Sequence, residues 1–330
     1  KLNPTRLAGI LEKLPLPDSP NLLVGMQTMD DAGVYKISDE VALVQTVDFF
    51  FPIVDDPRSF GRIAAANSLS DIWAMGAKAI TAMNHLAYPA GRIPPEVIEE
   101  LLTGAAEKLH ESGVVLLGGH TMEQEELLYG MSVTGITNPE TALTNDNARP
   151  GDLIVLTKPI GTGVYCDAML NNGLSARQMN TYVFWMERLN KYASEIMQRF
   201  PVSCLTDVTG FGLLGHSLPI AQNAGVKLVF NSSDVPLLSG LPGLMDSFNP
   251  KGVCKCSEFV DRYLKISESV DRRLYTLFAE AQTSGGLLAT VKADEAEALV
   301  EVLHEHGDTE SAIIGQVCEM DHPETYLELV

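Results

Sequence analysis

The sequence predicts a two-domain α+β protein. The chain has 330 residues, of which 45% are apolar and 20% charged, and this length exceeds what one hydrophobic core usually organises. Predicted strands and helices alternate along the chain, and a polar, turn-forming segment at residues 138–151 interrupts them. We therefore expect a domain boundary there, with domains over residues 1–148 and 149–330.

The helices of the first domain follow from start signals, stop signals and apolar spacing. Residues 94–110 form an amphipathic pattern that opens on prolines and ends before Gly113. Residues 60–75 are apolar nearly all round, which predicts a buried helix. Apolar runs predict strands over residues 41–50, 81–88, 128–136 and a short buried one over 114–117.

The second domain begins with a predicted strand over residues 153–157. One long helix near residues 175–200 follows, then a strand that leads into Asp207. A late loop covers residues 282–287. No internal repeat or low-complexity tract is evident.

The charge balance excludes several classes of function. With 23 basic and 43 acidic residues the net charge is −20, which opposes nucleic-acid binding because that depends on Lys and Arg. No apolar run approaches the roughly 18 residues of a membrane span. Five scattered cysteines do not suggest a disulfide framework, and we expect a cytoplasmic protein. A bound phosphate would have to be met by metal ions and backbone N–H groups.

A glycine-rich run at residues 206–216 allows two interpretations. Gly210, Gly212 and Gly215 match the dinucleotide pattern G-x-G-x-x-G, and Asp234 lies about 20 residues further on. However, Asp207 precedes the first glycine, where its carboxylate would repel a pyrophosphate unless a divalent cation stood between them. We therefore favour a metal-bridged phosphate site over a dinucleotide site.

Four further aspartates occupy positions that make them candidates for contact with a metal ion or ligand. Asn67 and Asp71 share one face of the predicted buried helix, so Asp71 contacts either a metal or ligand or a structural N–H donor. Asp30 and Asp31 lie in a predicted turn, where a solvated Asx turn is the alternative. Asp48 ends a predicted strand beside three phenylalanines.

The chemistry of this acid set indicates the metal. Asp30, Asp31, Asp48, Asp71 and Asp207 offer hard oxygen ligands, which suit Mg²⁺ better than Zn²⁺. The sequence has no G-x-x-x-x-G-K-[ST] run for a P-loop. The segment at residues 118–121 either lets a phosphate or base approach or forms a tight turn. His120 either contacts a ligand or is held within its loop, and we expect His216 to cap local structure.

Taken together, several segments resemble the selenophosphate synthetases (selenide, water dikinases), a family within the aminoimidazole ribonucleotide synthetase superfamily. The likeness covers nearly the whole chain, and it rests on residues 21–25, 30–32, 46–55, 60–67, 70–72, 74–76, 118–120, 206–216 and 282–288. The short acidic motifs are shared across the superfamily. The phenylalanine-rich segment and residues 207–216 are more particular to the selenophosphate synthetases.

The resemblance implies a PurM-like fold, in which the N-terminal domain forms a shared β-barrel across a homodimer and a C-terminal α+β domain closes the cleft. It implies the reaction of ATP, selenide and water to selenophosphate, AMP and phosphate, with Mg²⁺ and K⁺. Carried over by position, the Mg²⁺ ligands are Asp31, Asp71 and Asp207. The residues lining the ATP site are Thr28, Met29, Asp30, Asp48, Asp71, Gly119, His120 and Thr121. Lys1 falls on the catalytic lysine of the family.

The sequence departs from the family at two points. The glycine-rich segment with a Cys or selenocysteine, which precedes the lysine in the family, is not part of this sequence. Met29 stands where many relatives carry a basic residue. Two other functions stay open: another kinase of the superfamily, such as a thiamine-monophosphate kinase, and a non-catalytic relative that binds nucleotide and regulates a partner.

Overall fold

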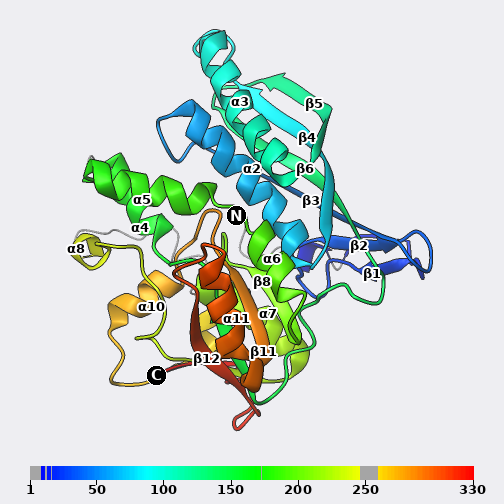
Figure 1. Cartoon of the computed structure of the whole chain (residues 1–330), viewed down its shortest axis with the longest axis vertical. Helices are drawn as coiled ribbons and strands as arrows, with labels where there is room; N and C mark the ends of the chain where they lie inside the picture. Colours follow the sequence, from blue (N-terminus) through cyan, green and yellow to red (C-terminus); the bar gives the residue numbers. More distant parts are fainter. Residues whose placement is uncertain (1–8, 12, 16, 172, 246–258) are drawn as a thin grey trace.

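The computed structural model describes residues 9–11, 13–15, 17–171, 173–245 and 259–330, and it contains two sheets with their helices (Figure 1). The first sheet has six strands in the order β1-β2-β3-β6-β4-β5. Only β4 and β5 run parallel within it. The strands are β1 Leu22–Val24, β2 Gly33–Lys36, β3 Ala42–Phe50, β4 Lys78–Tyr88, β5 Val115–Glu123 and β6 Leu128–Thr137.

Helix α2 (Pro57–Ala74) packs against this sheet beside α3 (Pro95–Ser112), as Figure 1 shows. The α2 helix is buried along most of its length, which confirms the prediction from its apolar composition. It begins at Pro57, earlier than predicted, because the Asp56 side chain accepts the N–H of Ser59 at 2.7 Å. Gly61 and Gly104 let the two helices touch, since a Cβ on either would lie 1.9–2.0 Å from a carbonyl oxygen of the other helix.

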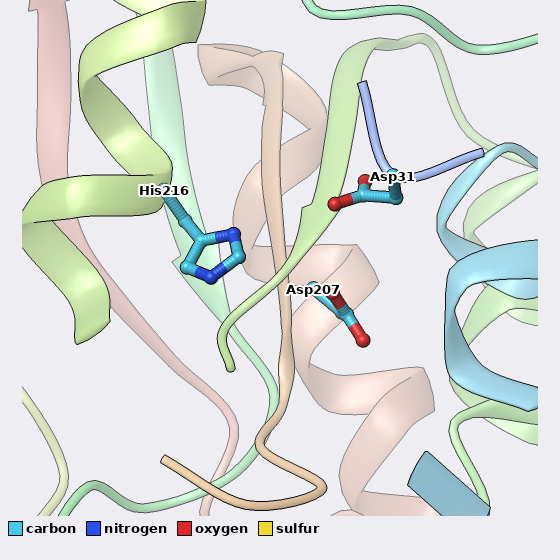
Figure 2. A group of neighbouring side chains, drawn as sticks. All are labelled: Asp31, Asp207 and His216. Carbon is cyan, nitrogen blue, oxygen red and sulfur yellow. The ribbon is translucent and has the colours of Figure 1, made fainter. Parts of the chain in front are cut away.

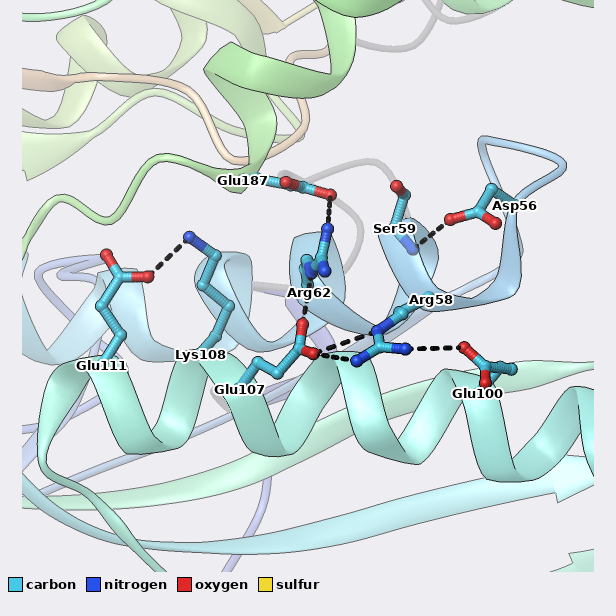
Figure 3. Close-up of polar contacts among 9 residues, drawn as sticks. All are labelled: Asp56, Arg58, Ser59, Arg62, Glu100, Glu107, Lys108, Glu111 and Glu187. Carbon is cyan, nitrogen blue, oxygen red and sulfur yellow. Dashed lines mark hydrogen bonds and ion pairs between the residues drawn. The ribbon is translucent and has the colours of Figure 1, made fainter.

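Arginine side chains on α2 complete this helix pair (Figure 3). Arg62 donates to Glu107 of α3 at 2.6 Å and lies 3.6 Å from Glu187 of the second domain. Arg58 also pairs with Glu107, and with Glu100 at 3.3 Å. Both guanidinium groups therefore serve contacts between helices and do not face the aspartates of the site.

The strand β5 differs from the prediction. We expected a short buried strand followed by a turn, but β5 is one continuous edge strand that extends through Gly118–Thr121. Its residues are exposed, with Leu117 at 64% and Met122 at 56%. The face of the sheet opposite α2 is open as well, because Val47 and Phe49 are more than half exposed. Apolar composition alone had suggested burial, but this chain supplies no layer over that face among its described residues.

The second sheet has seven strands in the order β10-β13-β9-β12-β7-β11-β8. Its central strands are buried almost throughout, as in β11. The strands are β7 Asp152–Leu156, β8 Val202–Asp207, β9 Lys227–Phe230, β10 Leu264–Ile266, β11 Leu287–Lys292, β12 Ala312–Cys318 and β13 Leu327–Leu329. The helices are α4 Thr162–Leu170, α5 Ala176–Glu187, α6 Lys191–Met197, α7 Gly212–Ala224, α8 Pro242–Met245, α10 Arg272–Phe278 and α11 Ala293–Glu305, with a 3₁₀ turn at Asp261–Tyr263.

The long helix predicted near residues 175–200 is wrong, because α5 and α6 are separate helices. Arg188 between them is extended, and its carbonyl accepts the buried amine of Lys158 at 2.6 Å. Asn190 donates to Ser70 and to the carbonyl of Gly285, both at 2.8 Å. These long-range hydrogen bonds break a helix that local propensity would have continued. In the part of the chain that the structure describes, no helix has the length and apolar character that crossing a membrane requires.

Candidate active site between the domains

A polar cavity of about 200 Å³ lies between the two domains. Every element that carries a predicted metal ligand reaches it: the turn before β2, helix α2, and the end of β8. Its walls contain no lysine or arginine among the described residues. The lining residues are Met29, Asp30, Asp31, Thr46, Val47, Asp48, Asp71, Thr206, Thr209, Phe211, Gly215, His216 and Pro219.

Asp48 is held by a chain of hydrogen bonds that crosses the domain junction. The Asn67 amide donates to Asp48 Oδ2 at 2.6 Å, and the N–H of Ser284 donates to Asn67 Oδ1 at 2.9 Å. Ser284 has φ +47° and is 2% exposed, in the predicted loop before β11. Asn67 therefore orients Asp48 from α2 and links it to the second domain.

The other acids of the first domain have hydrogen-bond donors too. Thr46 of β3 donates its hydroxyl proton to Asp71. Thr28 donates to Asp30, and the N–H of Asn145 reaches Asp30 at 2.8 Å from the segment between the domains. Burial nevertheless raises the pKa of Asp30 above its usual value. These donors fix the carboxylates as acceptors that point into the cavity.

Asp31 and Asp207 meet at the junction itself. Asp207 ends β8 with no exposed surface, and Thr206 donates to Asp31 at 2.9 Å. The other oxygen of Asp31, Oδ2, is buried without a hydrogen-bond partner among the described residues. Burial, and then the carboxylates of Asp207 and Asp71, raise the pKa of Asp31 well above 3.8. A cation at this point would relieve that repulsion.

His216 of α7 extends this group (Figure 2). Side-chain ligand atoms of Asp31, Asp207 and His216 all lie within 4.8 Å of one another. The His216 Nε2 atom lies 3.3 Å from both the N–H of Phe211 and the hydroxyl of Thr209. The ring therefore bonds to the residues just before its own helix, as expected for a capping role, and its other edge faces the aspartates (Figure 2).

The structure brings most of the predicted site residues together. Met29, with φ +55°, and four of the five aspartates, Asp30, Asp31, Asp48 and Asp71, line the cavity. Asp207 is buried beside Asp31, and Thr28 donates a hydrogen bond to Asp30. Gly119, His120 and Thr121 do not line it, because β4 and β6 separate β5 from β3. Gly119 lies in register with Asp48 across the strands of the sheet. His120 lies in register with His85 one residue further along, and the side chains at that position face the open side of the sheet. Lys1 lies outside the described residues.

Sequence reasoning missed several residues of the cavity. Thr46, Thr206 and Thr209 were not singled out, although each of them stands within two positions of a predicted aspartate. Asn145 lies in the segment between the domains and was interpreted only as part of a turn. Adjacency to an acid was the available signal, but a strand turns alternate side chains to opposite faces, so the sequence did not show which neighbours point inward.

The arrangement around the glycine-rich run does not match a dinucleotide fold. Gly212 and Gly215 do begin a helix after a strand. However, β8 is an edge strand whose neighbour β11 runs antiparallel, and β9, which follows α7, is not next to β8. The parallel βαβ unit that the fingerprint requires is therefore missing here. Gly212 has φ +69°, and a Cβ there would lie 2.6 Å from the Glu280 carbonyl, so this glycine serves the turn.

Comparisons with known proteins agree with this geometry. Residues 29–137 match the model of the AIR synthase related protein N-terminal domain, and residues 149–328 match that of the C-terminal domain. The selenide, water dikinase of Clostridioides difficile is 42% identical over 96% of this chain and 91% of its own. That of Pelobacter propionicus is 44% identical over 97% and 92%. The chain belongs to the selenide, water dikinase family.

The fold is shared more widely than this family. One similar solved structure is described as AaThiL complexed with AMPPCP and TMP. The match covers 98% of the present chain and 91% of the AaThiL chain, with a TM-score of 0.70. Its sequence identity is 16%, so the likeness shows the fold alone. The expected two-domain PurM-like α+β architecture is thereby confirmed, and the family assigns a kinase-type phosphotransferase activity.

Proposed function

We propose that this chain makes selenophosphate from selenide, ATP and water, with release of AMP and phosphate, in the cavity between its domains. One observation carries the assignment to this cavity: Asp30, Asp31, Asp48 and Asp71 line it, Asp207 of the second domain lies beside Asp31, and its described lining residues include no lysine or arginine. A polyphosphate can enter such a cavity only together with a cation. The family relationship then names the phosphoryl acceptor.

The donor set fits Mg²⁺. The ligand candidates are Asp31 and Asp71 of the cavity wall and Asp207 beside Asp31, all of them carboxylates, and hard oxygen ligands are what Mg²⁺ prefers. The buried Asp31 Oδ2, which has no hydrogen-bond partner in the described part of the chain, is the atom that most needs a cation. Bound Mg²⁺ would neutralise the polyphosphate charge that otherwise keeps an anionic selenide away.

The residues of the chain then position the reactants. Asn67 keeps Asp48 turned into the cavity, and Thr46 does the same for Asp71. Met29 and Asp30 form the wall nearest the segment between the domains, and Thr28 donates a hydrogen bond to Asp30. A catalytic role for Lys1 and a requirement for K⁺ remain predictions from the family resemblance.

We also propose that the chain forms a homodimer through the open face of the first sheet. The face exposes Val47, Phe49, Met83 and Met122, and such a contiguous apolar surface is typical of an interface. A groove of about 350 Å³ on it is lined by Phe49, His85 and His120 among others. Contacts of Gly119, His120 and Thr121 with ATP would depend on the second copy, because within one chain they lie away from the cavity.

The nucleotide product tests the function. Incubation with ATP, Mg²⁺ and selenide under anaerobic conditions should give AMP only when selenide is present. ADP as the final product would indicate a simple kinase of the superfamily. If the chain binds ATP but forms no product, with or without an added upstream segment that carries the family Cys, the non-catalytic alternative would replace the proposal.

The oligomeric state is tested separately by analytical ultracentrifugation. Met83→Glu places a charge on the open face at a side chain that is already 46% exposed, so it should convert a dimer to a monomer without unfolding the chain. Leu170→Glu is the matched control, because Leu170 is 66% exposed on α4 of the other domain. A wild-type monomer, or a dimer that survives Met83→Glu, would contradict this interface.

A further inference from the structure

His216 lines the cavity and lies just after the first turn of α7. Gly215 before it leaves room for Phe211, since a Cβ at Gly215 would lie 2.6 Å from the Cβ of Phe211. The rings of Phe211 and His216 lie 5.6 Å apart, and the backbone N–H of Phe211 donates to His216 Nε2 at 3.3 Å. The local turn therefore sets the orientation of the imidazole.

The same contact assigns the protonated nitrogen of the ring. A backbone N–H can only donate, so Nε2 must offer its lone pair to Phe211. The Thr209 hydroxyl at 3.3 Å can rotate to donate to the same atom. In the neutral imidazole the proton then resides on Nδ1. That nitrogen belongs to the ring edge that faces Asp31 and Asp207 (Figure 2).

A nitrogen that carries a proton has no lone pair for a metal ion. Although His216 lies close enough to Asp31 and Asp207 to form a three-residue metal group, its geometry supplies a donor there. The described walls of the cavity hold no lysine or arginine, so a phosphate in it needs N–H and O–H donors. The imidazole is the one nitrogen-containing side chain among the described lining residues.

We propose that the Nδ1–H group of His216 donates a hydrogen bond to a phosphate oxygen of the nucleotide held at Asp31 and Asp207, and that His216 is not a metal ligand. The inference rests on the proposed function, because it presupposes that a metal-bound polyphosphate occupies the cavity. His216 then binds substrate directly while its Nε2 atom stabilises the start of α7. Each ring nitrogen has a separate task, so the two tasks can be separated by substitution.

Two amide variants separate the tasks. The side-chain amide of asparagine stands as many bonds from Cα as Nδ1 does, so His216→Asn keeps a donor toward the cavity and loses the acceptor for Phe211. Glutamine reaches as far as Nε2, so His216→Gln keeps the acceptor and loses the donor. Affinity for AMPPCP in the presence of Mg²⁺, measured by isothermal titration calorimetry, is the readout, and AMP is the comparison ligand.

We expect His216→Asn to bind AMPPCP within about threefold of wild type, and His216→Gln to bind it about 10- to 100-fold more weakly, as for a lost hydrogen bond to a charged group. The affinity for AMP should stay near wild type in both. The opposite order, with His216→Gln intact and His216→Asn impaired, would show a purely structural role. Loss in both variants of the Mg²⁺-dependent rise in Tm without nucleotide would show that His216 is a ligand.

The tautomer can be measured without any substitution. With ¹⁵N-labelled histidine, NMR of the whole protein should show the proton of His216 on Nδ1, and a proton on Nε2 would overturn the proposal even if both variants failed to fold. If wild type does not bind AMPPCP with Mg²⁺, the proposed function fails as well. If wild type binds and neither variant differs from it, only the role of His216 fails.

Discussion

The carboxylates of Asp48 and Asp31 share one cavity, but the protein treats them differently. Asp48 receives the amide of Asn67 at 2.6 Å, within a hydrogen-bond chain that reaches Ser284. Asp31 has one donor, Thr206, and a buried oxygen with no hydrogen-bond partner among the described residues, and it lies beside Asp207. The first carboxylate is in place before any ligand binds. The Asp31 carboxylate lowers the stability of the folded protein, and a bound cation would offset this loss.

The largest effect should follow from removing a charge at the junction. In Asp207→Asn or Asp31→Asn, AMP formation from ATP and selenide should fall on the order of a thousandfold, because the cation loses a buried ligand. The rate is measured at saturating ATP over a range of Mg²⁺ concentrations. Turnover within tenfold of wild type, with unchanged Mg²⁺ dependence, would remove these residues from the metal site.

Stability without metal should change in the opposite direction. Asp31→Asn should raise the Tm of the metal-free protein by about 3 °C, because an amide in this place is free of the repulsion from Asp207. The pKa of Asp31 is raised in the folded state, so the folded protein holds this proton more tightly than the unfolded chain does. Metal-free wild type should therefore lose stability as the pH rises from about 4 through the raised pKa.

Thermal scans at several pH values, with and without Mg²⁺, measure both effects. The pH-dependent loss should be smaller in Asp31→Asn, and Mg²⁺ should stabilise wild type more than the variant. If Asp31→Asn is less stable than wild type in the absence of metal, the Asp31 carboxylate does not destabilise the metal-free protein as we infer.

A smaller effect is expected on the side of Asp48. Asn67→Ala leaves Asp48 and the N–H of Ser284 without this partner, which should lower turnover about 10- to 100-fold and stability by about 1–3 kcal/mol. Ser68→Ala is the control, because within the described residues the hydrogen bonds of the Ser68 side chain go to the main chain of Asp48 and of Met131. Equal losses of turnover in both variants would mean that α2 packing matters here and the orientation of Asp48 does not.

The smallest effect should come from the threonine donors. Thr206→Val removes the hydrogen bond to Asp31 at 2.9 Å, and Thr46→Val removes the one to Asp71. Each should weaken the apparent affinity for Mg²⁺ by about three- to tenfold, as for a single neutral donor. Assays of turnover against Mg²⁺ concentration compare them. If Thr206→Val weakens the affinity for Mg²⁺ less than Thr46→Val does, Mg²⁺ binding at Asp31 and Asp207 depends less on the Thr206 hydroxyl than we infer.

Much of the fold and of the site was predictable from local patterns. The buried helix α2 followed from apolar residues on all its sides, and Asp71 stood out because no arginine was near enough to pair with it. The structure confirms the reason, since Arg62 is engaged by Glu107 and Glu187. Asp207 was recognisable because a carboxylate before a glycine-rich turn conflicts with direct phosphate binding.

Other features had no local signal. The break between α5 and α6 arises from hydrogen bonds of Arg188 and Asn190 to residues far away in the sequence. Exposure of β5 depends on which layers cover the sheet, and apolar residues look alike on a buried strand and on an open edge. The direction of Thr206 and the ring orientation of His216 depend on strand pleat and on one backbone N–H.

The sequence by itself determined the two-domain α+β organisation, the acids available for a cation, and the family. It could do so because apolar periodicity, net charge and motif spacing are local properties of the chain. Only the tertiary structure decided that Asp31 and Asp207 meet across the domain junction while Gly119–Thr121 lie on an open edge. Desolvation and mutual repulsion depend on distances between residues that are far apart in the sequence, and those distances exist only once the chain has folded.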